Sequence, residues 1–354
     1  MNLYIPTLIY SEKDCVKNHG KELAVAGNKA FIITGKHSSR VNGSLKDVTD
    51  VLDAEGKSYV IFDDIEENPS IETVMKARET GIKEQVDYVI GIGGGSPLDA
   101  CKAIAMMIAN PKEDETVLYE SKPLKALPVI TVPTTAGTGS EVTPYSILTI
   151  HEKKTKKSIS HKIYPVMALI DYTYLKTQSQ NVLINTAVDA LAHLVESYLN
   201  TNSNELNRVY SIEGMRLFGE IKDRLKSPDD EVYAKLSNIA MIAGMAISHT
   251  GTSLPHGLSY SVTYELGIPH GKAVGIFLAG YVKLYKNVEE ARKVLGFLGF
   301  SCYDKFDKYL LELLGEVAIP EELVKRNAEQ IYSNKAKLKN YPFDVTVEEL
   351  KAIL

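Results

Sequence analysis

The feature that most constrains the fold of this chain is a change in its pattern of apolar residues near residue 176. Before it, short β-branched and aromatic runs alternate with helical patterns, which favours parallel strands joined by right-handed crossovers. Strands are expected near the N-terminus and at Lys29–Thr34, Tyr59–Phe62, Tyr88–Ile92, Val129–Val132 and Ala168–Asp171. Helices are expected at Ser44–Glu55, at Ser70–Glu84 and from Pro97 onward, and a protruding hairpin at Ser146–His161.

After residue 176, strand-like runs almost disappear and amphipathic patterns with a helical period take their place. The expected helices are Leu183–Leu199, Leu206–Leu225, Glu231–Ser248, Ala273–Tyr285, Val288–Leu298 and Tyr303–Val317. We therefore predict an α/β domain over residues 1–176 and an all-helical domain over residues 177–354. A ligand site between two such domains is expected.

Composition excludes several classes of protein. Apolar residues make up 44% of the 354 residues, which argues against disorder, and the net charge of −5 gives no reason to expect nucleic acid or anionic lipid as a partner. No targeting segment is visible, and the longest nearly uncharged apolar run, Ile239–Ile247, is too short to span a bilayer. Three scattered cysteines, Cys15, Cys101 and Cys302, argue against a disulfide framework, so a cytoplasmic location is expected.

Three consecutive glycines, Gly93–Gly95, follow one predicted strand. Ser96 and Pro97 are expected at the N-cap and first position of the next helix, whose N-terminus would face the glycine turn. Such a turn suits phosphate or pyrophosphate, although a strand-to-helix turn without a ligand is the alternative. GIGGGS is not the GxGxxG fingerprint, because it has no glycine at the required third position.

A second loop, Thr131–Pro144, also follows a strand and is rich in hydroxyl groups. Hydroxyls and backbone amides suit the amide, ribose or phosphate groups of a nucleotide, and an ordinary loop with local turns is the alternative. Its polar residues include Thr134, Thr135, Thr138, Ser140 and Glu141.

The strongest signal is Asp189 with His193, at i and i+4 in a stretch that is otherwise apolar from residue 187 to residue 195. A buried carboxylate and imidazole need a partner, and a cation satisfies both. His256 and His270, each expected on a Pro-His-Gly turn, would supply two more ligands. One aspartate with three histidines suits Fe²⁺, Zn²⁺ or Mn²⁺. The alternative to a metal site is a set of core histidines that each have their own hydrogen-bond partners.

Taken together, GGGSPLDACKAIA, PTTAGTGSE, DALAHLVESY and PHG…PHGKAVGI resemble the iron-containing (group III) alcohol dehydrogenase family, in order over roughly residues 28–277. The resemblance implies a dehydroquinate synthase-like architecture, an α/β N-terminal nucleotide-binding domain followed by an all-α C-terminal domain that carries the metal. It implies reversible oxidation of a small primary alcohol or diol to the carbonyl compound with a nicotinamide cofactor, and a homodimer.

The family's functional residues carry over position by position. The residues that match its metal ligands are Asp189, His193, His256 and His270, with Fe²⁺ as the expected ion and Zn²⁺ as the alternative. The residues that match its cofactor-binding positions are Gly94, Gly95, Ser96, Asp99, Lys102, Thr134, Thr135, Thr138 and, as a weaker match, Lys157.

The first departure from the family concerns the cofactor. Many members have an aspartate at the end of the early strand, where it would accept hydrogen bonds from the ribose hydroxyls. This chain instead has Gly35, followed by Lys36, Ser38, Ser39 and Arg40. A glycine with basic residues nearby would accept a 2′-phosphate that an acid would repel, so NADP is predicted in preference to NAD.

The second departure concerns proton transfer. Numerous relatives have a histidine four residues after the third metal ligand, where this chain has Tyr260, which is therefore a candidate for donating or passing a proton. Glycerol dehydrogenase-like and maleylacetate reductase-like oxidoreductases share the layout. A dehydroquinate synthase-like lyase would need clustered basic residues near the ligands, where Leu183–Asn200 and Thr250–Lys272 contain only Lys272. A non-enzymatic nucleotide-binding module would leave four metal-type ligands unexplained.

Overall fold

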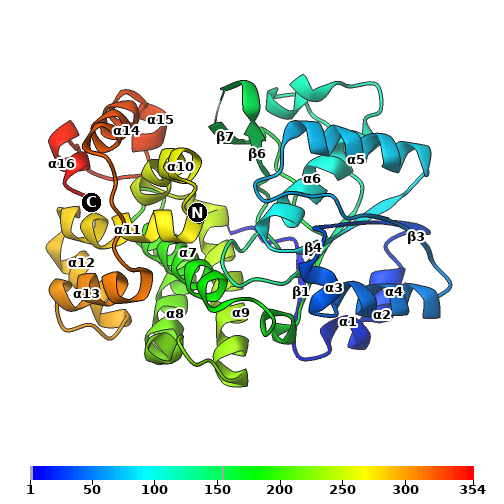
Figure 1. Ribbon diagram of the computed structural model, residues 1–354, viewed down its shortest axis with the longest axis horizontal. Helices are drawn as coiled ribbons and strands as arrows, with labels where there is room; N and C mark the ends of the chain where they lie inside the picture. Colours follow the sequence, from blue (N-terminus) through cyan, green and yellow to red (C-terminus); the bar gives the residue numbers. More distant parts are fainter. Residues whose placement is uncertain (1–2, 154) are drawn as a thin grey trace. The chain divides into compact units, whose positions relative to one another are not determined.

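The computed structural model describes residues 3–153 and 155–354, which divide into two compact units (Figure 1). One unit is Ile5–Gln178, and the other is Ser179–Leu354 together with residues 3–4. The first holds a parallel sheet with helices, and the regular elements described in the second are all helical. The predicted fold class, an α/β part followed by an all-α part, is therefore confirmed.

The first unit is built on six parallel strands in the order β1-β8-β5-β4-β2-β3. They are β1 (Leu8–Ser11), β2 (Lys29–Thr34), β3 (Ser58–Phe62), β4 (Tyr88–Gly93), β5 (Val129–Pro133) and β8 (Met167–Ile170). The predicted strands agree with β2, β3, β4, β5 and β8 to within one residue at each end. The agreement is close because turn residues on both sides of a short β-branched run mark where the strand begins and ends.

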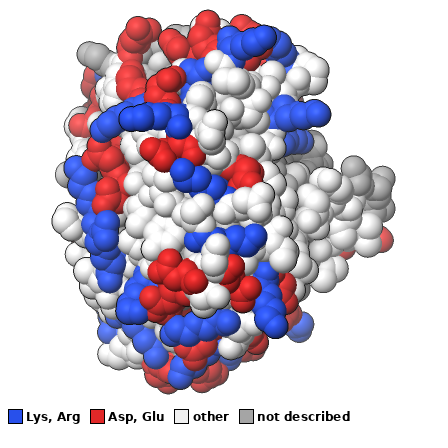
Figure 2. Space-filling view, turned by 90° about the vertical axis from the view of Figure 1, so that its right-hand side faces the viewer, with Lys and Arg blue, Asp and Glu red and all other residues white. Residues whose placement is uncertain are grey.

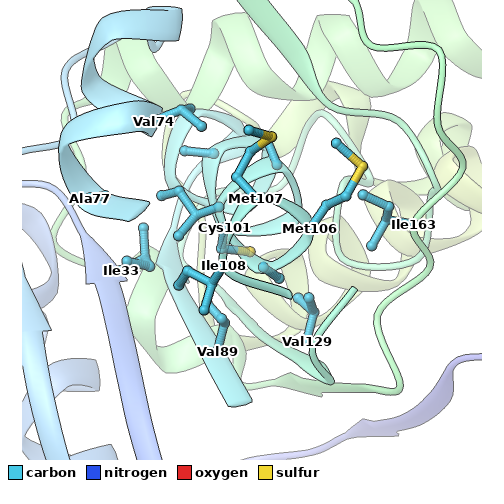
Figure 3. Close-up of a cluster of buried hydrophobic side chains, with 14 of the residues drawn as sticks. Ile33, Val74, Ala77, Val89, Cys101, Met106, Met107, Ile108, Val129 and Ile163 are labelled. Carbon is cyan, nitrogen blue, oxygen red and sulfur yellow. The ribbon is translucent and has the colours of Figure 1, made fainter. Parts of the chain in front are cut away.

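Helices cover both faces of this sheet, so its central strands are buried on both sides. The helices are α1 (Cys15–Asn18), α2 (Gly20–Ala24), α3 (Ser38–Val41), α4 (Ser44–Ala54), α5 (Ile71–Lys83) and α6 (Gly95–Ala109). Phe31 and Ile33 of β2 pack in one core with α5 and α6, which Figure 3 shows around Met106 and Met107. The alternate residues Ala30 and Ile32 pack in a second core with α1, α2 and α4.

The predicted hairpin is present as β6 (Ile147–Ile150) and β7 (Thr155–Ser158), paired antiparallel. Lys154, in its predicted basic middle, lies outside the described residues. The N–H of Thr149 donates to the carbonyl of Pro69 over 2.8 Å, which ties the hairpin to the segment before α5.

The predicted start of α6 is wrong by two residues. The helix begins at Gly95 with Gly94 as its N-cap, because Gly93, the last residue of β4, takes a φ of 148° and turns the chain there. Ser96 therefore lies inside the first helical turn, where its hydroxyl accepts the N–H of Asn68 over 3.0 Å.

The helical unit is arranged around α7, which is buried continuously from Ala187 to Tyr198 and packs against α8, α9 and α11. Its helices are α7 (Gln180–Tyr198), α8 (Glu205–Ile221), α9 (Asp230–Thr250), α10 (Leu254–Leu266), α11 (His270–Leu284), α12 (Val288–Phe297), α13 (Tyr303–Leu314), α14 (Glu321–Ser333), α15 (Lys335–Leu338) and α16 (Val347–Lys351). The six predicted helices are present as α7, α8, α9, α11, α12 and α13, and α10 and α14–α16 were not predicted.

Charged side chains of both signs are interspersed over the face drawn in Figure 2. On the α/β unit, Lys36 and Lys76 both pair with Asp64. The face therefore has no broad area of one charge that would attract a polyanion. Among the described helices, none is both long enough and apolar enough to cross a membrane.

Candidate functional site

Three histidines of the helical unit converge on one carboxylate oxygen. The Nε2 atoms of His256, His270 and His193 lie 3.4, 3.8 and 3.9 Å from Oδ1 of Asp189. The ring of His193 stacks on that of His256 with centroids 4.5 Å apart. The structure therefore brings the possible ligand atoms of Asp189, His256 and His270 to within 4.8 Å of one another. The fourth residue that the sequence proposed as a ligand, His193, contacts this group through Asp189 Oδ1 and through the ring of His256.

His256 and His270 lie at helix starts and not on the turns that the Pro-His-Gly sequences predicted. Pro255 occupies the first turn of α10, and Pro269 is the N-cap of α11. Proline suits such positions because its φ is close to helical and the first helical N–H groups have no partner within the helix. Each proline thus fixes the start of the helix whose first turn carries a histidine.

The geometry of this cluster fits a metal ion. Two ligands that are each about 2.1 Å from a tetrahedral ion lie about 3.4 Å apart, close to the separations from Asp189 Oδ1. Both Asp189 Oδ1 and His256 Nε2 are buried and have no hydrogen-bond partner among the described residues. Unpaired polar atoms are costly in a protein interior, and a cation between these atoms would satisfy them. Three imidazoles and a carboxylate suit Fe²⁺ or Zn²⁺.

The charges of the cluster are strongly coupled. Burial by itself would raise the pKa of Asp189, but the surrounding imidazoles, His193 first, hold that pKa well below its usual range. Burial would lower the pKa of His256, yet the carboxylates of Glu196 and Asp189 raise it to about 9. A metal ion must displace a proton from such an imidazole, so its binding depends on pH.

Glu196 is a residue of this cluster that the sequence did not single out. It is fully buried on α7, and its Oε2 pairs with Nδ1 of His256. Its Oε1 accepts the N–H of Ser253 over 2.8 Å and the N–H of His256 over 3.2 Å. The signal was available, because residues 189, 193 and 196 share one helix face at i, i+4 and i+7.

Tyr260 lies one helical turn after His256 on α10. Its ring is parallel to that of His270 to within 12°, with centroids 6.0 Å apart. The half-buried tyrosine therefore borders the metal cluster on the His270 side.

The predicted cofactor loops follow three neighbouring strands of the other unit, β5, β4 and β2, at their carboxyl ends. The N–H of Thr134 donates to the carbonyl of Gly93 over 2.9 Å. A Cβ added to Gly94 would lie 3.1 Å from Thr135 Oγ1, and one added to Gly95 would lie 2.6 Å from Thr138 Cγ2. The structure thus packs the threonine loop onto the glycine turn, at the edge where open α/β sheets bind their ligands.

Lys102 and Asp99, both on α6, form hydrogen bonds with the threonine loop and the residues that follow it. Lys102 is fully buried, and its Nζ donates to the carbonyl and hydroxyl oxygens of Ser140 and to the carbonyl of Tyr145, all within 2.8 Å. Asp99 accepts the Ser140 hydroxyl and the N–H of Ile147. Burial lowers the pKa of Lys102 and raises that of Asp99. The hydrogen bonds of both side chains therefore fix the position of the loop.

The structure separates the two lysines of β7. Nζ of Lys157, the predicted cofactor residue, lies over the ring of Tyr119, 4.9 Å from its centroid. Lys156 donates to Oδ1 of Asn68 over 2.6 Å, and the N–H of Asn68 donates to Ser96 at the start of α6. Lys156 is thus linked through Asn68 to Ser96 in the first turn of α6, and Lys157, the adjacent strand residue, points to the other face.

The segment after β2 is only partly arranged as the sequence suggested. Gly35 is half-buried, and Ser38 and Arg40 are exposed. Ser39 is buried, with its hydroxyl accepting that of Thr34 over 2.8 Å, so it faces the interior.

The predicted cations of this segment both have acidic partners. Lys36 pairs with Asp64 over 2.8 Å and Arg40 with Asp63 over 2.7 Å. These two carboxylates follow β3, the strand next to β2 in the sheet, and no sequence pattern near Gly35 indicated them.

Comparison with known proteins confirms the family resemblance. The model of the family described as iron-containing alcohol dehydrogenase matches residues 6–172, and that of the Fe-containing alcohol dehydrogenase family, C-terminal, matches residues 183–353. A solved structure of an iron-containing alcohol dehydrogenase from Thermotoga maritima is 38% identical, covers 99% of this chain and 98% of its own, and superposes with a TM-score of 0.93.

Two curated relatives have more specific names. Lactaldehyde reductase of Escherichia coli K12 is 31% identical over 71% of this chain and 66% of its own length. NADPH-dependent butanol dehydrogenase of Clostridium saccharobutylicum is 26% identical over 88% of this chain and 84% of its own length. The matched segments span only 37% to 66% of the length of several curated relatives. Since the two family models together match most of its length, the chain belongs to the iron-containing alcohol dehydrogenase family.

Proposed function

We propose that this chain is a metal-dependent alcohol dehydrogenase that transfers a hydride between a small alcohol and the nicotinamide ring of NADP or NAD. The observation that carries this proposal is the convergence of three imidazole Nε2 atoms on Oδ1 of Asp189. The proposed metal ligands are Asp189, His193, His256 and His270, with Fe²⁺ as the expected ion and Zn²⁺ as the alternative.

When bound, the ion would supply Lewis-acid chemistry, which favours loss of the proton from an alcohol hydroxyl near neutral pH. Asp189 contributes the negative charge that balances such an ion among neutral imidazoles. Tyr260, beside His270, is the proposed group for passing the hydroxyl proton. The alcohol carbon gives its hydride to the nicotinamide, so one proton and one hydride leave the substrate.

The cofactor is proposed to bind along the loops after β4 and β5. The amides of the glycine turn and the N-terminus of α6 suit the pyrophosphate, and Lys156 lies on the same side through Asn68. The threonine loop, fixed by Lys102, would lie beside the phosphates and nicotinamide. The residues proposed for these contacts are Gly94, Gly95, Ser96, Thr134, Thr135 and Thr138.

The substrate class is a small primary alcohol or diol with its aldehyde. This rests on relatives named lactaldehyde reductase and butanol dehydrogenase. The chain is further proposed to act as a cytoplasmic homodimer, and sedimentation of the purified protein tests that state.

A preference for NADP is proposed because no acid stands at Gly35 and two cations follow it. Lys36 and Arg40 are exposed and near the end of β2, although a 2′-phosphate would have to compete with Asp64 and Asp63 for them. The expected preference is therefore moderate. A larger kcat/KM with NADH than with NADPH would overturn it.

The whole proposal is tested with purified protein, metal analysis and a panel of aldehydes and diols with both cofactors. His256→Ala should lose bound metal and activity while keeping its circular dichroism spectrum, because His256 contributes a ligand and not an apolar core contact. The exposed His151→Ala serves as the matched control and should retain both. Full activity of His256→Ala, or of a metal-free preparation, would refute the metal's role.

A further inference from the structure

We infer that Glu196 is the positioning residue that presents His256 to the metal, an inference that rests on the proposed metal centre. Glu196 lies on α7 seven residues after Asp189 and is fully buried. It contacts His256 from the side opposite to Asp189, since its Oε2 pairs with Nδ1 while Nε2 faces Asp189 Oδ1. Glu196 therefore touches a proposed ligand and would not itself contact the ion.

Three N–H donors converge on this one carboxylate: Nδ1 of His256 and the backbone amides of Ser253 and His256. An ionised carboxylate only accepts hydrogen bonds, so it can satisfy all three donors. Once the imidazole has lost its second proton, as metal binding requires, Nδ1 keeps the remaining proton and the lone pair of Nε2 is directed toward Asp189. The carboxylate thus selects the imidazole tautomer that can bind a metal through Nε2.

The same carboxylate fixes the start of α10. Ser253 is the N-cap of this helix, and no side-chain hydrogen bond from its hydroxyl caps the first turn. Oε1 of Glu196 takes the backbone N–H of His256, the third residue of the helix, which would otherwise lack an intrahelical partner. A negative charge at that position also stabilises the helix, because it interacts favourably with the positive N-terminal end of the helix dipole. One side chain from α7 therefore sets both the backbone position and the ring orientation of His256.

This geometry predicts an effect on metal affinity. A carboxylate that accepts the distal N–H of a ligating imidazole raises its basicity, and loss of such a partner typically weakens metal binding about 10- to 100-fold. Glu196→Gln keeps the size of the side chain but turns an NH₂ group toward at least one of the three donors. Glu196→Asp keeps the charge and shortens the reach by one methylene.

The test measures binding of Zn²⁺ to the metal-free full chain in competition with a chromophoric chelator, and the visible spectrum of the Co²⁺-loaded protein. Glu196→Gln should raise the Kd for Zn²⁺ about 10- to 100-fold and alter the Co²⁺ bands, with Glu196→Asp intermediate. Glu290→Gln is the matched control, because Glu290 is a largely buried acid of the same unit paired with Arg208 and Lys293. It should bind both ions as the wild type does.

Two results would overturn the inference, and they are distinguishable. If Glu196→Gln is less stable but keeps the wild-type Kd and Co²⁺ spectrum, Glu196 serves the fold alone. If the wild type binds neither ion, the metal centre itself fails, and the inference fails with it. Should Glu196→Gln not fold, the same criteria apply to Glu196→Asp, which must then differ from wild type in both readouts.

Discussion

The backbone of Gly271 lies directly against the carbonyl group of Asn185, so that a Cβ added at residue 271 would lie 1.8 Å from the Asn185 oxygen. Gly271 follows His270 in the first turn of α11, and Asn185 lies one turn before Asp189 on α7. The missing side chain therefore sets how closely α11 approaches α7. The 3.8 Å separation of His270 Nε2 from Asp189 Oδ1 depends on that approach.

Gly271→Ala should consequently disturb the metal cluster without changing a ligand. The added methyl meets rigid backbone, so relief requires α11 to shift, and overpacking of this kind costs about 1–3 kcal/mol of unfolding free energy. We expect the Kd for Zn²⁺ to rise at least about tenfold, which corresponds to a loss of about 1.4 kcal/mol. Chelator competition and thermal unfolding measure the two effects.

Gly296→Ala is the control for this substitution. Gly296 is exposed on α12, and an added Cβ there meets nothing within 4 Å. Alanine should stabilise that helix by up to about 1 kcal/mol and leave metal binding unchanged. Wild-type metal affinity in Gly271→Ala would show that the ligand geometry does not depend on this contact.

The sequence predicted the elements whose signals are local. Strands such as β2 are short β-branched runs, and Asp189 with His193 is an i, i+4 pair on an apolar helix. Helix α10 was not predicted, because its sequence LPHGLSYSVTYEL contains glycine, serines and β-branched residues of low helix propensity. The helix is stabilised by the packing of its buried residues. The sequence shows Glu196 on the helix face of Asp189 and His193, but not its contacts, because its partners Ser253 and His256 are 57 and 60 residues away.

The cofactor region shows the same limit. Sequence order revealed the basic residues after Gly35, but not that Asp63 and Asp64 follow the neighbouring strand and pair with them. Strand order decides such contacts, and a run of residues cannot show which strand will lie next to it.

Arg40→Ala tests the proposed preference for NADP. If Arg40 contacts a 2′-phosphate, removing it should lower kcat/KM with NADPH about tenfold, a typical value for one charge-assisted contact, and change that with NADH less than about twofold. Lys46→Ala, an exposed cation of α4 paired with Asp50, should change neither. Equal losses with both cofactors in Arg40→Ala would show that its role is not phosphate recognition.

Lys102→Met tests whether the buried lysine holds the threonine loop. The substitution leaves Asp99 without its cation and three oxygens without their donor, and breaking a buried pair in this way costs about 3–5 kcal/mol of unfolding free energy. Because these contacts lie in the α/β unit, the Kd for NADPH should rise, while the Kd for Zn²⁺ should not.

The exposed Lys112→Met is the control for Lys102→Met and should leave stability and both affinities unchanged. Fluorescence titration with NADPH provides the readout for the nucleotide. Nucleotide binding by Lys102→Met that equals the wild type would mean that the loop keeps its position without the lysine.

Glu141 predicts a pH dependence of stability in the α/β unit. Burial raises its pKa from 4.5 to about 7 in the folded protein, with its own backbone N–H and Lys102 opposing the shift. Between these values the folded state holds a proton that the unfolded state has lost, so the unfolding free energy falls as pH rises through this window. The full penalty, up to about 3 kcal/mol at about 1.4 kcal/mol per pH unit, is present above pH 7 and absent below about pH 4.5.

Glu141→Gln removes the ionisation, so its gain over wild type in denaturant unfolding should be larger at pH 8 than at pH 5. The exposed Glu72→Gln should show no such change, and an equal difference at both pH values for Glu141→Gln would exclude this carboxyl as the source.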